Sequence, residues 1–413
     1  MGVLLIKYSK LFPKIYKLKK KILIFSTHFY PENFIINDLV KRLSKKYNFF
    51  VVTSFPHYPK KEYYKDYSIF DIFEKKNSSL TILRLPVLGR AGNSFIFLGM
   101  NYISYLISFI FFLPIFFFIR FHSIFVFQTS PVTVAIPAII LKFLLKKKIT
   151  IWILDIWPEV VTSVCNITNK NLIYKILNLI TKFIYKHSDT ILVSSREFKK
   201  NINLKIINKE IIFFPQWSIN LKRKKNKFIK EDNTFKIFHI GNMGEAQDFK
   251  SILKAIEICP NNISWHFVGD GSARLEFEES LKYLRIKKNI YFYGSLPQDL
   301  LYNYYSKADA LLLSLKKSKI LELYLPAKLS AYLYYSKPIL LMASGDAYDL
   351  INDYKCGLVA KSGDYKKLSY NALKLSKSNK KFKLQLKQNS RKLYKKYFNF
   401  INNLKILKSR CFN

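Results

Sequence analysis

Two carboxylates and an indole follow one apolar run in the first half of the chain. The run Ile149–Leu154 has the composition of a buried strand, and Asp155-Ile156-Trp157-Pro158-Glu159 comes directly after it. Carboxylates in such a place can hydrogen-bond sugar hydroxyls, and Trp157 can stack on the face of a sugar ring. The alternative is helix capping, because acidic residues are common before and within a first helical turn.

A lysine opens a predicted helix in the second half. In the sequence LPAKL at residues 325–329, Pro326 suits the first position of a helix that runs to about Tyr335, which puts Lys328 in its first turn. A cation there opposes the helix dipole, at a cost of up to about 1 kcal/mol. A bound diphosphate would remove that cost, because helix-start amides also hold phosphates. The alternative is an ordinary surface lysine.

Glycines follow other strand candidates of the second half. The segment Gly241–Gly244 follows the run Phe235–Ile240, and the segments Gly269–Gly271, Gly294–Leu296 and Ser344–Asp346 follow three further runs. Glycine lets the backbone pass close to a ligand, and ligands gather beyond the carboxyl ends of strands in open α/β sheets. These loops therefore predict a phosphate site, with tight turns as the alternative. Neither a GxGxxG pattern nor a Walker loop occurs.

Two more loops of the first half end at the same predicted sheet edge as Asp155. Glu32 and Asn33 follow the run Ile22–Ser26, and His57 follows the run Phe49–Thr53. A lone histidine is more often structural, but the prolines beside His57 favour a surface position. No HExxH, GxSxG, Cys–His–Asn or EF-hand pattern occurs, and no DxD pair follows a strand, so we expect no bound metal.

The composition indicates a globular protein with a large excess of positive charge. Apolar residues make up 50% of the 413 residues, which excludes a wholly disordered chain. The 69 Lys and Arg exceed the 27 Asp and Glu, which gives a net charge of +42. Compositional drift is one origin of this charge. Whatever its origin, the positive charge favours anionic partners such as phospholipid surfaces and diphosphates. Nucleic acid is not expected, because the lysines scatter over both halves.

The spacing of the four cysteines limits which metal sites and disulfides the chain can form. They lie far apart without a CxxC pair, so neither a structural zinc site nor a disulfide framework is predicted, and a reducing cytoplasm fits.

Apolar runs of strand length alternate with amphipathic stretches such as Asn33–Lys46 and Leu172–Lys186. This alternation predicts an α/β fold with two doubly wound, parallel, Rossmann-like domains. We predict a basic extension at residues 1–20, domains at 21–219 and 234–385 joined by a linker at 220–233, and a basic C-terminal helix at 386–413. Besides the strands already named, the predicted strands are Leu80–Leu85, Ile124–Gln128, Thr190–Ser194, Ile211–Phe214, Trp265–Val268, Ile290–Tyr293, Ala310–Leu313, Ile339–Met342 and Gly357–Ala360.

One segment, residues 94–119, carries no charge and is almost entirely apolar. Its length permits a transmembrane helix, but Pro114 interrupts it and a strand follows directly. We expect a helix that packs on the sheet and leaves one apolar face for lipid. A true membrane span and a fully buried helix are the alternatives. Seven lysines within Lys7–Lys21 could also lie on anionic lipid.

Several motifs, in order over most of residues 21–375, resemble those of family 4 glycosyltransferases. The similarity is greatest to the branch that acts in O-antigen, capsule and colanic-acid assembly, which includes L-fucosamine transferases. The motifs are the sequence FYPENF at 29–34 with NDL at 37–39, Thr129-Ser130-Pro131, Asp155–Glu159, Gly241–Gly244 with Gln247-Asp248, and Leu325–Leu329 with Lys337-Pro338-Ile339.

The resemblance implies a GT-B fold, in which two Rossmann-like domains face each other across a cleft. It implies that the sugar of a nucleotide-sugar donor is transferred with retention and without a metal or other cofactor, with UDP as the expected nucleotide. The donor would bind the second domain. The acceptor, a lipid-linked saccharide at the cytoplasmic face of the inner membrane, would bind the first, and the protein would be a peripheral membrane enzyme.

The resemblance also implies roles for single residues. Lys328 would stabilise the leaving diphosphate, and Asp155, Glu159 and His57 would position the acceptor together with Glu32, Asn33 and Trp157. The donor would contact Gly241, Asn242, Gly244, Gln247, Asp270, Gly294, Leu296, Glu322, Pro326, Lys328, Leu329, Gly345 and Asp346.

The chain departs from the family pattern at two places. Many members carry a pair of glutamates that would fall at Leu323 and Ala331 here, with Glu322 one position before the first. Many also carry an Arg and a Lys where Asn242 and Gln247 stand. These differences shift the phosphate charge onto Lys328 and helix amides.

Two rival functions fit the same residues. A nucleotide-sugar 2-epimerase of this fold would need carboxylates and histidines near the donor, of which the second domain offers few. A membrane-surface binding protein with a decayed catalytic site is the other, since Ala331 and Gln247 replace residues that many family members use.

Overall fold

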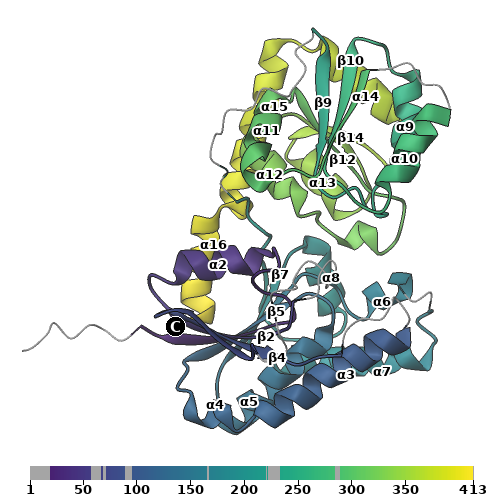
Figure 1. The fold of residues 1–413 in the computed structure, drawn as a ribbon. Coiled ribbons are helices and arrows are strands. Elements are labelled where there is room, and N and C mark those ends of the chain that lie inside the picture. Colours follow the sequence, from purple (N-terminus) through teal and green to yellow (C-terminus); the bar gives the residue numbers. More distant parts are fainter. Residues whose placement is uncertain are drawn as a thin grey trace, which may run out of the picture. The chain divides into compact units, whose positions relative to one another are not determined.

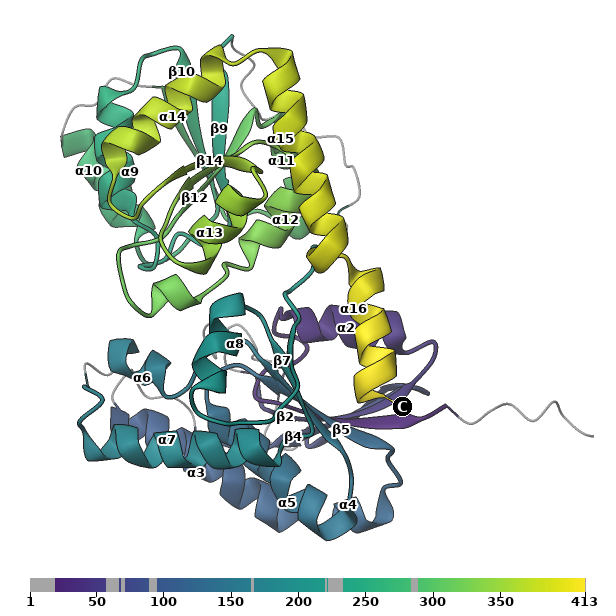
Figure 2. The same cartoon turned by 180° about the vertical axis from the view of Figure 1, so that it is seen from behind.

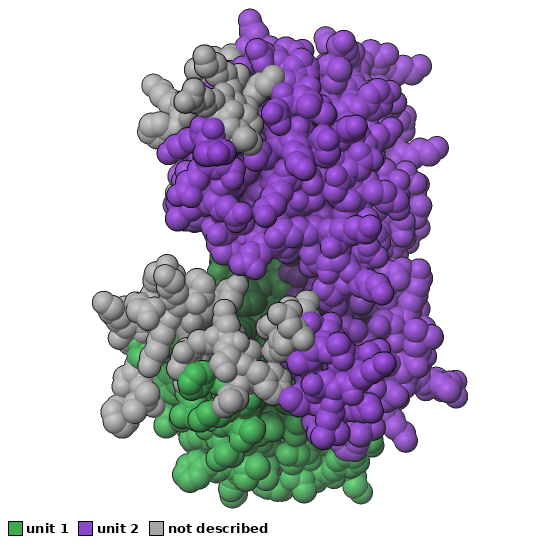
Figure 3. Space-filling view, turned by 90° about the vertical axis from the view of Figure 1, so that its right-hand side faces the viewer, with its two compact units in different colours: residues 1–151, 187–189, 412 green, residues 152–186, 190–411, 413 purple. Residues whose placement is uncertain are grey.

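The computed structural model describes residues 19–56, 67, 71–88, 95–164, 167–219, 221, 233–283 and 289–412. By its internal contacts the chain divides into two compact units (Figure 3). The first comprises residues 1–151, 187–189 and 412, and the second comprises residues 152–186, 190–411 and 413. His57, Cys165, the chain up to residue 18 and all of the predicted linker except Leu221 and Asn233 lie outside the described residues.

The first sheet has the strand order β3-β4-β2-β1-β5-β6-β7-β8 (Figure 1). The pairs β1–β2, β1–β5, β2–β4 and β7–β8 are parallel, and β3 pairs with β4 in the antiparallel direction. Every strand predicted for this half is present, and β3 is an addition. The strands are β1 Lys21–Ser26, β2 Asn48–Ser54, β3 Phe73–Asn77, β4 Leu80–Leu85, β5 Ser123–Gln128, β6 Ile149–Ile153, β7 Thr190–Val193 and β8 Ile211–Phe213.

The second sheet is parallel throughout, with the order β11-β10-β9-β12-β13-β14. Its alternating residues enter two separate cores, since Phe238 and Ile240 pack in one and Ile237 in the other. Helices therefore cover both faces, and the predicted doubly wound α/β fold is confirmed. The strands are β9 Phe235–Ile240, β10 Ile263–Val268, β11 Asn289–Gly294, β12 Ala310–Ser314, β13 Ile339–Met342 and β14 Gly357–Ala360.

The helices connect successive strands and continue past the last one. They are α2 Ile35–Leu43, α3 Phe95–Phe112, α4 Ile115–Phe118, α5 Ile136–Leu145, α6 Glu159–Val164, α7 Leu172–His187, α8 Arg196–Asn203, α9 Phe249–Ile258, α10 Arg274–Tyr283, α11 Leu301–Lys307, α12 Lys328–Tyr335, α13 Asp346–Asp353, α14 Tyr365–Lys377, α15 Lys380–Leu393 and α16 Phe400–Ile406. Short 3-10 turns precede three of them, among them η4 at Leu321–Leu323.

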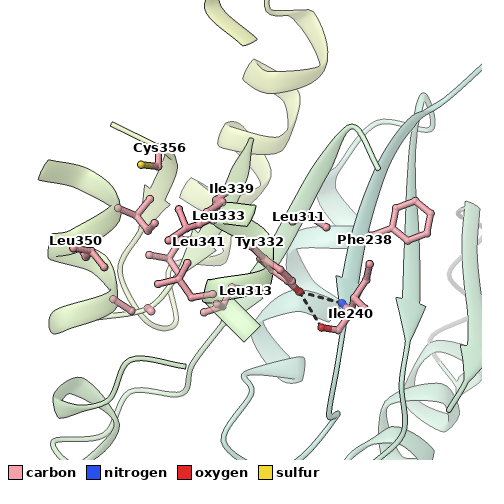
Figure 4. Close-up of a cluster of buried hydrophobic side chains, with 14 of the residues drawn as sticks. Phe238, Ile240, Leu311, Leu313, Tyr332, Leu333, Ile339, Leu341, Leu350 and Cys356 are labelled. Carbon is pink, nitrogen blue, oxygen red and sulfur yellow. Dashed lines mark hydrogen bonds between the residues drawn. The ribbon is translucent and has the colours of Figure 1, made fainter. Parts of the chain in front are cut away.

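A buried tyrosine fixes α12 against the second sheet (Figure 4). The Tyr332 hydroxyl accepts a hydrogen bond from the backbone N–H of Ile240 at 3.0 Å and donates to the carbonyl of Leu312 at 3.0 Å. These contacts tie the helix to the last residue of β9 and to the middle of β12. Because Tyr332 lies one turn after Lys328, these contacts also fix the position of the backbone from which the Lys328 side chain extends.

The apolar segment 94–119 folds as two helices. Pro114 directly precedes α4 and separates it from α3. Phe109 of α3 and Phe116 of α4 pack on Phe25 of β1, with ring centroids 5.7 and 6.2 Å away. Figures 1 and 2 show α3, α4 and α5 together on one side of the first unit's strands. No helix among the described residues has the length and hydropathy that a membrane crossing requires.

Candidate functional site

The strand order of the second sheet reverses between β9 and β12. In doubly wound sheets the loops beyond the carboxyl ends of the strands at such a point bind the ligand. The loop that follows β9 begins at Gly241, and the predicted lysine helix α12 follows β12 in the chain. The structure therefore brings two of the predicted features to one edge of the sheet.

Backbone hydrogen bonds join three of the predicted glycine loops. Gly241 N–H donates to the carbonyl of Val268, Met243 N–H to Asp270, and Gly269 N–H to Gly294, each at 2.8 Å. Gly269 has a φ of +138°, and a Cβ there would lie 2.0 Å from the Gly241 carbonyl oxygen. Only glycine fits this close approach. The loops at Gly241–Gly244, Gly269–Gly271 and Gly294 are thus connected to one another, and we call them the loop layer.

Lys328 extends over this loop layer from the first turn of α12. Its Cε lies 3.4 Å from the position that a Cβ on Gly241 would take. Its Nζ contacts His239 Nε2 at 3.2 Å and donates to the Asn242 carbonyl at 3.1 Å. The side chain is half-buried, and no carboxylate among the described residues pairs with it. The predicted helix starts two residues later than expected, but Lys328 does lie in its first turn.

Burial strongly perturbs this pair of basic groups. Desolvation lowers the pKa of Lys328 from 10.5 to about 7. Burial, and then the charge of Lys328, hold the pKa of His239 well below its ordinary value of 6.5. Within the described part of the chain, neither group has a negative neighbour to stabilise a positive charge. An anionic ligand would supply that countercharge, so the geometry and electrostatics favour a phosphate-bearing molecule at this point.

Gln247 and Asn242 shape the loop rather than carry charge. The side-chain oxygen of Gln247 accepts a hydrogen bond from the backbone N–H of Gly244 at 2.9 Å, and Gln247 is buried. Asn242 is exposed and uses its backbone carbonyl to hold Lys328. Asp270 is exposed as well, and Gly294 and Leu296 are partly exposed.

Asp346 is fully buried and engaged with groups near α8. Its carboxylate accepts hydrogen bonds from Ser195 Oγ at 2.7 Å, from Arg196 N–H at 2.7 Å and from Arg196 Nε at 2.6 Å. Gly345, before it, has a φ of +73°, and a Cβ there would lie 2.0 Å from the carbonyl oxygen of Glu322. The predicted contact of Asp346 with the sugar donor stays a prediction. In the structure the Asp346 carboxylate is hydrogen-bonded to Ser195 and Arg196.

Asp155 and Glu159 lie in different polar environments. The Tyr324 hydroxyl, which follows η4, donates to Asp155 at 3.4 Å and accepts from Ile156 N–H at 3.3 Å. Glu159 accepts hydrogen bonds from Asn201 at 3.1 Å and from Lys205 at 2.7 Å.

Trp157 and Pro326 are the remaining predicted residues near these groups. Trp157 is only 4% exposed, so stacking on a sugar, which stays a prediction, would require its side chain to become accessible. Pro326 directly precedes the first turn of α12, and Leu329 in that turn is fully buried.

A histidine and a glutamate pair at the end of β1 in the first unit. His28 Nδ1 lies 2.9 Å from Glu32 Oε2, both side chains are buried, and the imidazole stacks on Phe34 at 4.7 Å. Asn33 is exposed beside them. The predicted role of Glu32 and Asn33 in binding an acceptor is thus located at a carboxyl-end loop, and the role itself stays a prediction.

Sequence reasoning missed four residues that the structure brings to these sites. His239 precedes the end of its strand, where a polar residue in an apolar run was a usable signal. Ser195, Arg196 and Tyr324 had no such signal, because their partners lie more than a hundred residues away in the chain. In the parts of the chain that are described, no group of three or more His, Cys, Asp or Glu side chains could hold a metal ion.

Comparisons with known proteins agree with this architecture. Sucrose-phosphate synthase from Thermosynechococcus elongatus superposes with a TM-score of 0.70 at 13% identity, over 95% of this chain and 98% of its own. WaaG, a glycosyltransferase involved in lipopolysaccharide biosynthesis, gives 0.64 at 12% identity, over 95% and 100%. HepE from Anabaena in complex with UDP gives 0.61 at 11% identity, over 95% and 99%.

Comparison of the sequence finds similarity over a smaller part of the chain than comparison of the structure does. No curated protein shows significant sequence similarity to the chain. The sequence of residues 220–393 matches the family model of the group 1 glycosyl transferases. The molecule therefore has the GT-B fold of those solved enzymes, and its similarity in sequence to the group 1 glycosyl transferases is found over residues 220–393.

Proposed function

We propose that the protein is a retaining glycosyltransferase that moves a hexosyl or N-acetylaminosugar unit from a UDP-sugar to a lipid-linked saccharide. The observation that carries the proposal is the Lys328 ammonium group in the first turn of α12, which contacts an imidazole and a carbonyl and pairs with no carboxylate among the residues that the structure describes. The fold supports it, because solved structures that share it include HepE with bound UDP. A role in O-antigen or capsule assembly follows from the family resemblance and from the likeness to WaaG.

The reaction would proceed at the loop layer around Gly241. The donor diphosphate would rest on the turn 241–247 and on Lys328, and the loop at Gly294–Leu296 would hold the nucleobase. The bond between the sugar C1 and the phosphate oxygen breaks, and its electron pair stays on the diphosphate. Lys328 and the start of α12 stabilise that charge, which is often the largest contribution such a site can make.

The acceptor completes the exchange of bonds. Its hydroxyl oxygen forms the new bond to C1 from the face that the diphosphate leaves, and its proton passes to a phosphate oxygen. No strong base is required on this route. Asp155, Glu159 and His57 would orient the acceptor, together with the loop that carries Glu32 and Asn33.

The test is a donor screen with full-length protein and membranes as the acceptor, with products identified by mass. Lys328→Met should lower turnover about 10²–10³-fold if the lysine stabilises the leaving group. Lys250→Met is the matched control, because that lysine is 83% exposed and should leave the rate unchanged. A near-wild-type rate for Lys328→Met would remove the lysine from the mechanism.

Two further measurements separate the rival functions. Incubation of the nucleotide sugar without acceptor would yield an epimerised sugar only if the protein is a 2-epimerase. Calorimetric titration with UDP should show binding by the wild-type protein. No binding of UDP or of other nucleoside diphosphates would indicate a decayed site.

A further inference from the structure

Helix α3 has polar side chains turned toward the protein, and large apolar side chains cover its outer face. Asn101 donates to the carbonyl of Leu88, Ser104 accepts from the N–H of Leu88, and Ser108 donates to the carbonyl of Pro86. Tyr105 and Phe109 are buried on this inner face. A surface helix of a soluble domain has the reverse arrangement, so the outer face of α3 is the feature that needs a partner.

The outer face continues onto the two neighbouring helices. Helix α3 contacts α5, and α4 follows α3 after two residues. At about 200 Å² for each large side chain, ten side chains that are roughly half exposed present on the order of 1,000 Å², whereas the largest patch on a soluble monomer is typically about 300–600 Å². The apolar surface consists of Phe97, Met100, Ile103, Ile107, Ile110, Phe111, Phe117, Phe118, Phe143 and Leu144, which are 41–86% exposed.

Basic residues gather where these helices end. Arg120 follows α4 and is exposed, and Lys146 and Lys148 follow α5 and are exposed. The N–H of Ile124 donates to the carbonyl of Lys148 at 2.9 Å, and that of His122 donates to Lys21 at 2.7 Å, which brings three basic segments together. We call Lys19–Lys21, Arg120 and Lys146–Lys148 the basic rim.

The rim has no acidic counterpart in the surrounding sequence. No Asp or Glu occurs between Glu74 and Asp155, a stretch that includes all three helices. One carboxylate from elsewhere in the chain, that of Asp189, lies near the end of α5, where it pairs with Lys142 at 2.7 Å and accepts a hydrogen bond from Ile149 N–H. An apolar face bordered by lysines and arginines matches a lipid bilayer with anionic headgroups. A second copy of the chain fits less well, because it would bring two basic rims and two +42 chains together.

We propose that the outer face of α3, with α4 and the end of α5, docks in the plane of an anionic lipid surface. Helix α3 cannot present its whole circumference to lipid, because Tyr105 and Phe109 are packed inside the protein. The proposal deepens the proposed function and names the surface from which a lipid-linked acceptor would come. Since α3 follows β4, its first turns begin at the carboxyl-end side of the first sheet, where His28 and Glu32 lie.

Vesicle flotation of the full-length protein tests the docking without any turnover. One vesicle set is phosphatidylcholine alone, and the other contains about 30% phosphatidylglycerol. We expect flotation with the anionic set, at least tenfold weaker flotation with the neutral set, and loss of anionic binding at high salt. Absence of flotation with the anionic vesicles at low salt would overturn the proposal, whatever the enzyme assays show.

Paired substitutions locate the contact. Ile103→Glu with Ile107→Glu should weaken anionic flotation at least tenfold. Leu204→Glu with Leu275→Glu is the matched control, since those side chains are 89% and 70% exposed elsewhere and the charge change is the same. Equal losses in both variants would overturn the assignment to this face. Both double variants should bind UDP and melt as the wild-type protein does. If Ile103→Glu with Ile107→Glu melts at a lower temperature, Ile103→Ser with Ile107→Ser replaces it in the flotation assay.

Two more outcomes decide between occupants. Arg120→Glu with Lys148→Glu should weaken flotation on anionic vesicles at least tenfold, and an unchanged affinity would contradict the role of the basic rim. Sedimentation in vesicle-free buffer should give a monomer. A dimer that Ile103→Glu with Ile107→Glu dissociates would assign the face to a second copy of the chain instead.

Discussion

Lys328 is a half-buried base, and the desolvation of its amine sets a pH dependence of stability. Its pKa is about 7 in the folded protein and near 10.5 when exposed. Between these two values the unfolded chain binds a proton that the folded chain lacks, so this residue makes the free energy of unfolding rise with pH over that window. Below about pH 7 the full cost of burying the charged ammonium remains.

Lys328→Met should therefore be more stable than wild type at about pH 6, and the difference should shrink as the pH rises toward about 10. Urea unfolding at several pH values measures the free energy of unfolding of both proteins. Subtracting the wild-type values from those of the variant cancels the contributions of the other titrating groups. Lys250→Met, at a lysine that is 83% exposed, is the matched control for the loss of one lysine. A pH-independent difference for Lys328→Met would contradict the desolvation of the Lys328 amine.

Gly269 shows how one residue without a side chain holds two loops together. A Cβ at this position would lie 2.0 Å from the Gly241 carbonyl oxygen, in addition to the strain of a φ of +138°. Gly363→Ala is the matched control, because it has a φ of +83° but nothing within 4 Å of its Cβ. We expect Gly363→Ala to cost about 1–3 kcal/mol, and Gly269→Ala to cost clearly more and to abolish UDP binding, by chemical unfolding and calorimetry. Equal costs with intact UDP binding would contradict the close approach.

Residue types and their place after strands made part of the site predictable. Pro326 placed the start of the helix that carries Lys328 to within two residues, because proline prefers the beginning of a helix. The partners of Asp346 could not be predicted, since the sequence contains no local trace of a contact with Ser195 and Arg196. Long-range pairing of polar side chains depends on the finished fold.

At the scale of elements, the pair Arg196–Asp346 connects the start of α8 to the start of α13. Asp346 is fully buried, whereas the Arg196 side chain is 32% exposed, which reduces the loss when the arginine is removed. We expect Arg196→Ala to cost about 1–3 kcal/mol, and Asp346→Asn with Arg196→Ala to be non-additive by about 1 kcal/mol or more. Urea unfolding of the four proteins in the cycle measures this. Additive losses would contradict a direct coupling, and UDP titration of Asp346→Asn would show whether the carboxylate also serves the donor.

Strands buried on both faces were predictable because nearly every residue in them is apolar. Strand β3 was missed, since its sequence FEKKN has four polar residues and lies at the edge of the sheet as its antiparallel member. The orientation of α3 was also beyond prediction. Both faces of that helix are apolar in sequence, and only the polar contacts of Asn101 and Ser108 with the segment 86–88 decide which one is buried.

At the scale of the whole molecule, most positive charges have no partner to pair with. Even if all 27 acidic side chains were paired, 42 basic ones would remain. Like charges that face one another destabilise a compact state, and salt screens them over a Debye length of about 8–10 Å at moderate ionic strength.

The melting temperature should therefore rise when NaCl is increased from about 0.02 to about 0.3 M, by about 1 °C for each kcal/mol of relieved repulsion in a chain of this size. Differential scanning calorimetry measures the shift. Lys328→Met should respond like wild type, because screening acts on the whole surface. A difference between the two responses would mean that chloride itself binds at Lys328. A melting temperature that falls with salt would mean that local ion pairs, such as Lys205–Glu159, contribute more than the net charge does.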